Sequence, residues 1–229
     1  MSAGPPKVWI TRAQPGADAT AARVSALGLE PLVAPLLEVR FLAPEIDLSG
    51  LAALAFTSAN GVRAFARLDP ERRLPVWAVG EATAEVAREA GFLEVRSAGG
   101  DVSSLTKAIA RDPPAGPLLH LAAREPAGDL AGALTARGVI ARRAAVYETV
   151  PAAAAQDPGE AADAEVVLLH SPRAARLLAA LARNRRLAAA RAACLSPAVA
   201  AALEAAIPAR SAQTPDEAAL LSLLETMAR

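Results

Sequence analysis

The chain contains an internal repeat with a period near 112 residues, and this feature restricts its fold more than any other. Arg12 aligns with Arg124, 112 positions later (124 − 12), and Ser58 aligns with Ser171, 113 positions later (171 − 58). Four sequence blocks recur in one order, although the abundance of alanine and arginine raises the chance of each individual match. The period exceeds the roughly 20 to 50 residues of a solenoid repeat. A chain of 229 residues with this repeat predicts two similar lobes.

Short apolar runs alternate with stretches of helical length in both copies of the repeat. The runs are Lys7–Thr11, Ala53–Thr57, Val76–Val79, Leu118–Ala122, Val166–His170 and Ala193–Leu195. The predicted helices are Gly61–Leu68, Thr83–Ala90, Asp129–Arg137, Arg173–Ala182 and Pro197–Ala206. Apolar strands that alternate with helices are typical of parallel sheets covered on both faces. The predicted fold class is therefore α/β, with a doubly wound parallel sheet in each lobe.

Two segments in equivalent places of the repeat show the alternating pattern of a half-exposed strand. The alternating positions are Leu37, Val39 and Phe41 in one segment and Ala145, Tyr147 and Thr149 in the other. Each segment fits an extended crossing between lobes, so we expect the linker to be a two-stranded β-ladder. The segment Ala152–Glu160 contains Asp-Pro-Gly and is expected to be a loop. The expected division is a discontinuous lobe of residues 1–36 and 150–229, a second lobe of residues 41–143, and a linker of residues 37–40 and 144–149.

Composition argues against several classes of partner and site. Twenty-four basic residues balance twenty-four acidic ones, so no overall field draws the chain to nucleic acid or to an anionic membrane. One cysteine and two histidines cannot form a Cys/His zinc site or an internal disulfide. The sequence shows no secretory signal, no apolar run of about 18 residues and no glycine-rich nucleotide motif. We expect a cytoplasmic protein without a metal, a nucleotide, a nucleic-acid partner or a membrane partner.

Small hydroxyl residues follow the predicted strands at the point where the next helix begins. They are Thr11, Thr57, Ser58, Thr83, Ser171 and Ser196. Each could simply cap the helix that follows it. Together they line the carboxyl ends of the strands, where doubly wound sheets bind ligands and helix N-termini attract anions. With Arg12 and Arg124 beside them, we expect a cleft between the lobes that binds a molecule with several carboxylates or phosphates.

The histidines and the cysteine each allow a structural and a chemical interpretation. His120 and His170 end apolar runs, where a histidine hydrogen-bonded to the backbone is the favoured interpretation and catalysis is the other. Cys194 lies in "RAACLSP" and is expected to be a small buried strand residue rather than a nucleophile.

Six short motifs, in one order along essentially the whole chain, resemble the uroporphyrinogen-III synthase family. They are "ITR" (Ile10–Arg12), "FTSANGV" (Phe56–Val62), "VGEATA" (Val79–Ala84), "YET" (Tyr147–Thr149), "LHSPRAA" (Leu169–Ala175) and "TPDEAAL" (Thr214–Leu220). The family's fold, two α/β lobes joined by a two-stranded ladder, agrees with the repeat. The chain departs from the family pattern at Leu195–Ala198, where Ile-Gly-Pro-Thr is common, and at His170, where Phe or Thr often precedes Ser-Pro.

The resemblance implies a lyase of haem (porphyrin) biosynthesis. Its substrate would be hydroxymethylbilane, a linear tetrapyrrole with eight carboxylates, which closes to uroporphyrinogen III with inversion of ring D through a spiro intermediate. The substrate also closes unaided to the uninverted isomer, so pre-organisation is the main catalytic contribution and no cofactor is required. We expect a monomer. The alternative is a two-lobed ligand-binding or regulatory module that keeps the fold without catalysis.

The resemblance also assigns roles to individual residues. Tyr147, the one tyrosine of the chain, matches the family's candidate acid, and Thr83 is the second catalytic candidate. A phenol is protonated at neutral pH and could hydrogen-bond the departing hydroxyl. The other interpretation of Tyr147 is an amphipathic strand residue with a solvated tip. The expected substrate-binding residues are Thr11, Arg12, Thr57, Ser58, Asn60, Arg124, Ser171 and Ser196.

Overall fold

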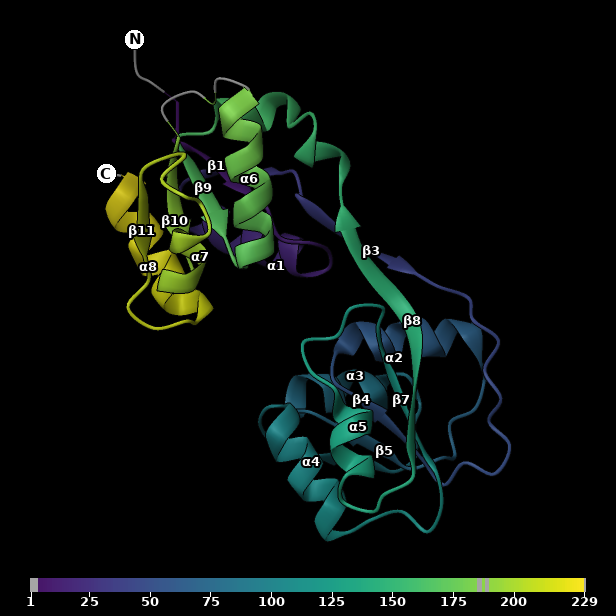
Figure 1. Cartoon of the computed structure of the whole chain (residues 1–229). Helices are drawn as coiled ribbons and strands as arrows, with labels where there is room; N and C mark the ends of the chain where they lie inside the picture. The colour runs from purple at the N-terminus through teal and green to yellow at the C-terminus, as the bar shows by residue number, and fades with distance from the viewer. Residues whose placement is uncertain (1–3, 185–186, 188–189, 229) are drawn as a thin grey trace. The chain divides into compact units, whose positions relative to one another are not determined.

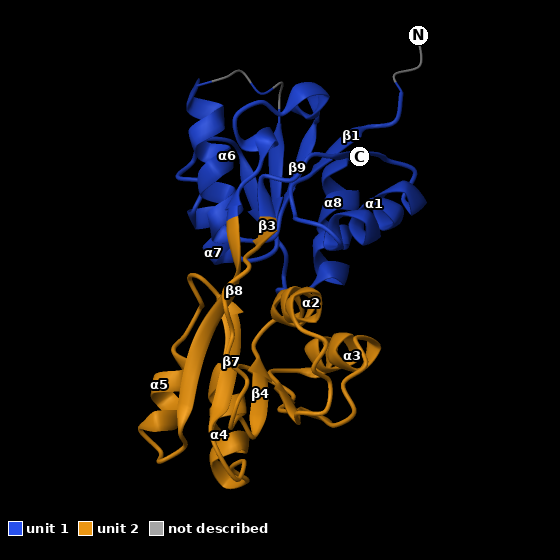
Figure 2. Ribbon diagram, turned by 90° about the vertical axis from the view of Figure 1, so that its right-hand side faces the viewer, with its two compact units in different colours: residues 1–38, 150–229 blue, residues 39–149 orange. Residues whose placement is uncertain are grey.

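The chain divides into two compact units in the computed structural model, which describes residues 4–184, 187 and 190–228. Unit 1 consists of residues 1–38 and 150–229, and unit 2 consists of residues 39–149. Figure 2 shows unit 1 in blue and unit 2 in orange. Residues 1–3, 185–186, 188–189 and 229 of the expected first lobe lie outside the described residues. The lobe and linker bounds expected from the sequence stay a prediction.

Unit 1 is built on a parallel sheet in which the described strands lie in the order β11-β10-β9-β1-β2. The strands are β1 (Lys7–Ile10), β2 (Glu30–Val33), β9 (Val166–Leu169), β10 (Arg191–Cys194) and β11 (Ala209–Ser211). The helices are α1 (Gly16–Ala26), α6 (Pro172–Asn184), α7 (Pro197–Ala201) and α8 (Glu217–Ala228). The central strands β1 and β9 are largely apolar on both sides because helices bury both faces of the sheet.

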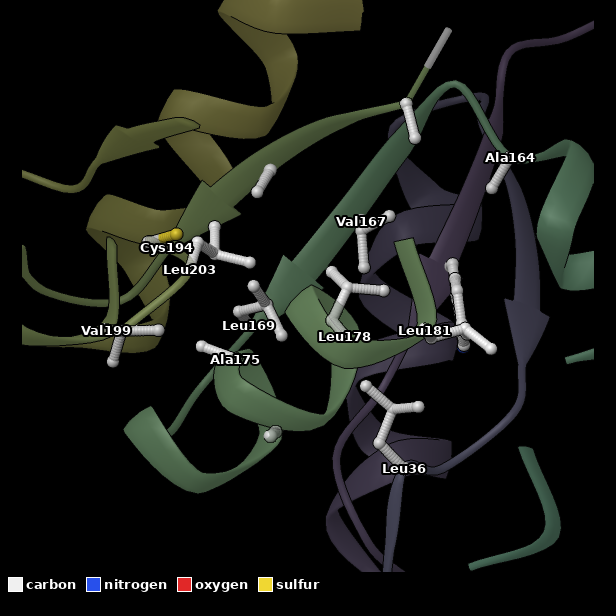
Figure 3. Close-up of a cluster of buried hydrophobic side chains, with 14 of the residues drawn as sticks. Leu36, Ala164, Val167, Leu169, Ala175, Leu178, Leu181, Cys194, Val199 and Leu203 are labelled. Atoms are coloured by element: carbon white, nitrogen blue, oxygen red, sulfur yellow. The ribbon is translucent and has the colours of Figure 1, made fainter. Parts of the chain in front are cut away.

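The alternation of side chains along the strands separates two cores in unit 1. Trp9 and Val167 point to the face covered by α6 and α7, and Val8 and Val166 point to the face covered by α1 and α8. Figure 3 shows the first core, where Leu178 and Val199 of the helices meet Val167 and Leu169 of β9. This arrangement confirms a doubly wound sheet.

Cys194 lies inside this core, as the structural interpretation of the sequence predicts (Figure 3). Its side chain is fully buried among Val167, Leu169 and Val199. Burial raises the pKa of the Cys194 thiol to about 12, because a thiolate would lose its hydration there. The thiol is therefore protonated and acts as a small apolar side chain.

Unit 2 is built on the second sheet, in which the described strands lie in the order β3-β8-β7-β4-β5-β6. The strands are β3 (Leu37–Phe41), β4 (Ala53–Phe56), β5 (Val76–Ala78), β6 (Val95–Ser97), β7 (Leu118–Ala123) and β8 (Ala141–Pro151). The helices are α2 (Ala59–Leu68), α3 (Glu81–Glu89), α4 (Val102–Arg111) and α5 (Leu130–Thr135) (Figure 1). Helices α2 and α3 cover Phe56 and Leu121 on one face, and α4 and α5 cover Ala55 and Leu118 on the other.

The two sheets share one strand order once the repeat is taken into account. Strands β7 and β8 of unit 2 correspond to β1 and β2 of unit 1, and β4, β5 and β6 correspond to β9, β10 and β11. The orders β2-β1-β9-β10-β11 and β8-β7-β4-β5-β6 then coincide. Unit 1 has the 2-1-3-4-5 arrangement of flavodoxin-like folds, and unit 2 has its circular permutation, 5-4-1-2-3 over β4 to β8. The structure therefore confirms two similar lobes. They differ in which strand of the shared arrangement comes first along the chain.

The chain crosses between the units on β3 and β8, as the alternating segments predict. The Leu42 amide donates to the Val146 carbonyl at 2.9 Å, and the Ala152 amide donates to the Leu36 carbonyl at 3.0 Å. The residue number falls in one strand as it rises in the other, so β3 and β8 run in opposite directions. This pairing confirms the two-stranded ladder.

The structure differs from the sequence expectations in three details. Helices α1, α4 and α8 lie outside the predicted helical stretches. The expected loop Ala152–Glu160 contains the 3₁₀ turn η1 (Ala153–Ala155) and the start of η2 (Gly159–Asp163). Helix α7 ends at Ala201 instead of Ala206, because the chain turns where Glu204 and Ala205 adopt φ of 51° and 55°.

Candidate functional site

The predicted site residues lie at the carboxyl edge of each sheet, because all strands in each parallel array end on the same side. In unit 1, Arg12 follows β1, Ser171 follows β9 and Ser196 follows β10. In unit 2, Ser58 follows β4 and Arg124 follows β7. The strand order reverses direction between β1 and β9 and between β7 and β4, and such switch points are where doubly wound sheets bind ligands.

Helix capping accounts for three of the predicted hydroxyl residues. The Ser58 hydroxyl accepts from the Asn60 amide at 3.1 Å, and Asn60 lies in the first turn of α2. The Ser171 hydroxyl accepts from the Ala174 amide at 3.2 Å, and Ser196 accepts from the Val199 amide at 3.4 Å. A capping serine keeps its hydroxyl proton available to a ligand, so the cap and a binding role are compatible.

Thr11 and Thr83 are two predicted site residues that the structure buries, and Tyr147, described below, is a third. The Thr11 side chain is fully buried, and its hydroxyl donates to the Leu168 carbonyl at 2.6 Å. This bond ties the end of β1 to β9 and uses the Thr11 proton inside the protein. Thr83 lies within α3, where Gly80 is the N-cap residue, and is 6% exposed.

A cluster around Glu217 lies at the carboxyl edge of unit 1 and includes Arg12. Glu217 Oε2 accepts from Arg12 Nη1 at 3.1 Å and lies 3.0 Å from His170 Nε2. Glu217 Oε1 accepts from the Thr20 hydroxyl at 2.6 Å. The hydrogen bond with His170, then that from Thr20 and the Arg12 charge, lower the pKa of Glu217 to about 2, although partial burial opposes this. Glu217 is therefore ionised at neutral pH.

Sequence reasoning did not identify Glu217 or Thr20 as members of the site. A signal for Glu217 was present, because Asp216 directly before it caps α8 by accepting from the Ala219 amide at 2.9 Å. That cap places Glu217 in the first turn of the helix. Thr20 is a buried residue inside α1, and nothing in the local sequence indicates its partner.

The two histidines have side-chain partners, which corrects the backbone interpretation made from the sequence. His170 bonds Glu217, as described above. His120 lies within β7 rather than at its end and is fully buried, with Nε2 3.0 Å from the Thr57 hydroxyl. Its Nδ1 has no hydrogen-bond partner within the part of the chain that the structure describes. Burial, and secondarily the charge of Arg143, lower the pKa of His120 to about 4, so this ring is neutral at physiological pH.

Tyr147 lies on β8 next to Arg124, where the pairing of β7 with β8 is irregular. Ala122 pairs with Ala145, but Ala123 pairs with Tyr147, so β8 has one extra residue at this step. Such bulges re-aim a side chain. The Tyr147 side chain packs in the core with α2 and is 8% exposed. The Arg124 amide donates to the Tyr147 carbonyl at 2.8 Å, and Arg124 Nη1 pairs with Glu148 Oε2 at 3.1 Å.

The described residues form neither a metal-binding cluster nor a membrane-spanning helix. In that part of the chain, no three His, Cys, Asp or Glu side chains gather as metal ligands would. None of the helices formed by these residues has the length and apolar character that crossing a bilayer requires.

The buried His120 makes the stability of the protein depend on pH. The folded pKa of His120, about 4, lies below the ordinary value of 6.5, so between these values the unfolded chain binds a proton that the folded chain does not. The free energy of unfolding should fall by about 3 kcal/mol as the pH falls through this window. Denaturant titrations between pH 7 and pH 4 measure this fall, and the free energy of unfolding of His120→Gln should depend less steeply on pH over the same range. Equal slopes in the two proteins would contradict the assignment.

Comparison with known proteins identifies the family. The family model described as uroporphyrinogen-III synthase HemD matches residues 18–222. The fold resembles that of uroporphyrinogen-III synthetase from Helicobacter pylori, at 22% identity and a TM-score of 0.70, over 97% of this chain and 99% of that one. It also resembles a mutant uroporphyrinogen III synthase from the extremely thermophilic bacterium Thermus thermophilus, at 17% identity and a TM-score of 0.53, over 96% and 98% of the two chains.

No curated protein sequence matches the chain. At these identities the two solved structures bear on the fold alone, and they share the α/β architecture with parallel sheets described above. The family model extends over most of the chain, from within α1 to within α8, and does not include β1 or the residues Thr11 and Arg12 that follow it. The chain belongs to the uroporphyrinogen-III synthase family.

Proposed function

We propose that this chain converts hydroxymethylbilane to uroporphyrinogen III, acting as a cyclising lyase in haem biosynthesis. The observation that carries the proposal is the family match over residues 18–222. The proposal includes action as a monomer in the cytoplasm. The competing proposal, a binding module without catalysis, has no observation in its favour.

The carboxyl edge of each sheet offers groups suited to the carboxylates of this substrate. Arg12 and Arg124 have side chains that are 36% and 61% exposed, so both can reach a ligand although each pairs with a glutamate. Helices α2 and α6 begin at the same edges, and their first amides and capping serines can donate to anions. Charge-assisted hydrogen bonds contribute roughly 1.5–3 kcal/mol each, so several of them can fix the conformation of a flexible chain.

The individual binding roles follow from this placement. We propose that Arg12, Ser58, Asn60, Arg124, Ser171 and Ser196 contact substrate carboxylates. We assign Thr57 to the same group, because it directly follows β4 beside Ser58, although its hydroxyl also lies 3.0 Å from His120 Nε2. Thr11 supports the site from within, since its hydroxyl is bonded to Leu168.

The chemistry that these residues must support is controlled loss of the substrate's terminal hydroxyl. Departure of that hydroxyl leaves an azafulvene cation, which closes through a spiro intermediate to invert the last ring. We propose that the Tyr147 phenol donates a hydrogen bond to the departing oxygen. Its burial in the core beside α2 restricts the orientation of the ring. A restricted ring favours donation from the phenol to the departing oxygen in a fixed geometry. Thr83 is the second candidate for a catalytic hydroxyl.

The reaction product tests the proposal directly. Purified protein incubated with hydroxymethylbilane should form uroporphyrinogen III, because pre-organisation must compete with unaided closure to isomer I. Chromatographic separation of the isomers measures the outcome, with heat-denatured protein as the control. Isomer I alone, at the rate of the control, would show that the chain is not a synthase.

Removal of the Tyr147 hydroxyl tests its role in the chemical step. Tyr147→Phe should lower kcat by tenfold or more, within the roughly 10²–10⁴ range typical of general acids. The KM should change little, because the groups that bind carboxylates remain. Thr149→Val is the matched control, since it removes a hydroxyl two residues along the same strand. A Tyr147→Phe enzyme with the wild-type kcat would exclude the phenol from the chemistry.

A further inference from the structure

Glu217 brings together segments of unit 1 that are far apart in the sequence. Its two carboxylate oxygens contact Arg12 after β1, Thr20 in α1 and His170 after β9, at 3.1, 2.6 and 3.0 Å. The Glu217 side chain itself is 18% exposed. Every one of these contacts lies at the carboxyl edge of the sheet or in the helix packed beside it.

Arg12 is held in one position by this cluster. Its Nη1 donates to Glu217 and also to the Thr20 hydroxyl, at 3.2 Å. The rest of the guanidinium lies directly over Gly16, where an added Cβ would come within 2.6 to 2.8 Å of Nε, Cζ and Nη2. The absence of a side chain at Gly16 is therefore required for this placement of Arg12 at the start of α1.

The fixed Arg12 still has capacity to bind an anion. Arg12 is 36% exposed, and the hydrogen bonds that the described residues form with its side chain use Nη1. A free arginine side chain has considerable rotamer entropy, part of which is lost when it binds a ligand. A guanidinium already held in place loses less on binding, and pre-organisation of this kind increases affinity.

We propose that Glu217 is a positioning residue that fixes Arg12 to receive a substrate carboxylate. The inference rests on the proposed function and adds a residue to its binding site. Glu217 does not touch the substrate in this account. It contributes through Arg12, and Thr20 supports it by holding the other carboxylate oxygen.

Kinetics separates positioning from a general structural effect. Glu217→Gln should raise the KM for hydroxymethylbilane by about tenfold, because a neutral amide replaces a charge-assisted bond. The kcat should stay within about twofold, since Tyr147 is unchanged. Glu204→Gln is the matched control, because Glu204 pairs with Arg183 at 3.0 Å while both side chains are more than half exposed.

The decisive comparison uses a background without Arg12. In Arg12→Ala protein, Glu217→Gln should add no further rise in KM, because the residue through which it acts is missing. An equal rise in both backgrounds, or an unchanged KM in the single variant, would overturn the proposal. If Glu217→Gln does not fold, Thr20→Val takes its place, with a smaller rise in KM that should also vanish in the Arg12→Ala background.

A measurement without substrate distinguishes this proposal from the function on which it rests. NMR of the arginine side chains should show a restricted Arg12 guanidinium in the wild type and an averaged one in Glu217→Gln. A wild-type protein that makes no isomer III but shows this difference would refute the function while keeping the positioning of Arg12. A guanidinium averaged equally in both proteins would overturn the positioning role itself.

Discussion

Parallel pairing of strands is the constraint on which the rest of this structure depends. A parallel sheet needs a crossover after each strand, and here the crossovers are helices that bury both faces. Parallel pairing also places the carboxyl ends of all parallel strands in a sheet at the same edge of that sheet. The residues directly after β1, β9, β4 and β7 therefore lie together within their own sheets, although long stretches of sequence separate them. We propose that chemistry is located at these edges, because most side chains there are not needed to fill the core.

Each unit stabilises its edge with a different buried polar arrangement. In unit 1, the ionised Glu217 forms hydrogen bonds with Arg12, Thr20 and His170. These bonds offset the cost of removing the carboxylate from water. In unit 2, a neutral histidine, His120, bonds Thr57 across β7 and β4. The two units repeat the backbone but not these networks. The repeat thus supplies two similar scaffolds, and the differing networks give them different electrostatic properties.

The sequence was informative where structure depends on local pattern. Apolar runs identified strands such as β4 and β9, and the alternation around Val39 and Tyr147 identified the two crossings. The edge strands β6 and β11 were not predicted, because Val-Arg-Ser and Ala-Arg-Ser contain no apolar run. Strand β5 is equally short, but its fully buried Val-Trp-Ala forms such a run. The helix at Pro197 was predicted too long, because alanine favours a helix but the turn at Glu204 and Ala205 ends it earlier.

The placement of the candidate residues was predictable, but their contacts were not. Hydroxyl and arginine residues were expected at the carboxyl edges of the sheets, and the structure places them there, since strand ends can be inferred from sequence. The partners of His120, His170 and Arg12 could not be inferred, because Thr57 and Glu217 lie 63, 47 and 205 residues from them along the chain. Such pairs are fixed by tertiary packing. The hydrophobic period and the capping pattern of a sequence do not predict them.

The central claim is that the carboxyl edges of both sheets bind the acidic tetrapyrrole. Titration of isotope-labelled protein with uroporphyrin III, a stable octacarboxylate, tests it most directly through backbone amide chemical shifts. The account predicts the largest shifts at residues 11–12, 57–60, 124, 171 and 196, which follow β1, β4, β7, β9 and β10. Shifts confined to the opposite, amino edges of the sheets, or to neither edge, would contradict it.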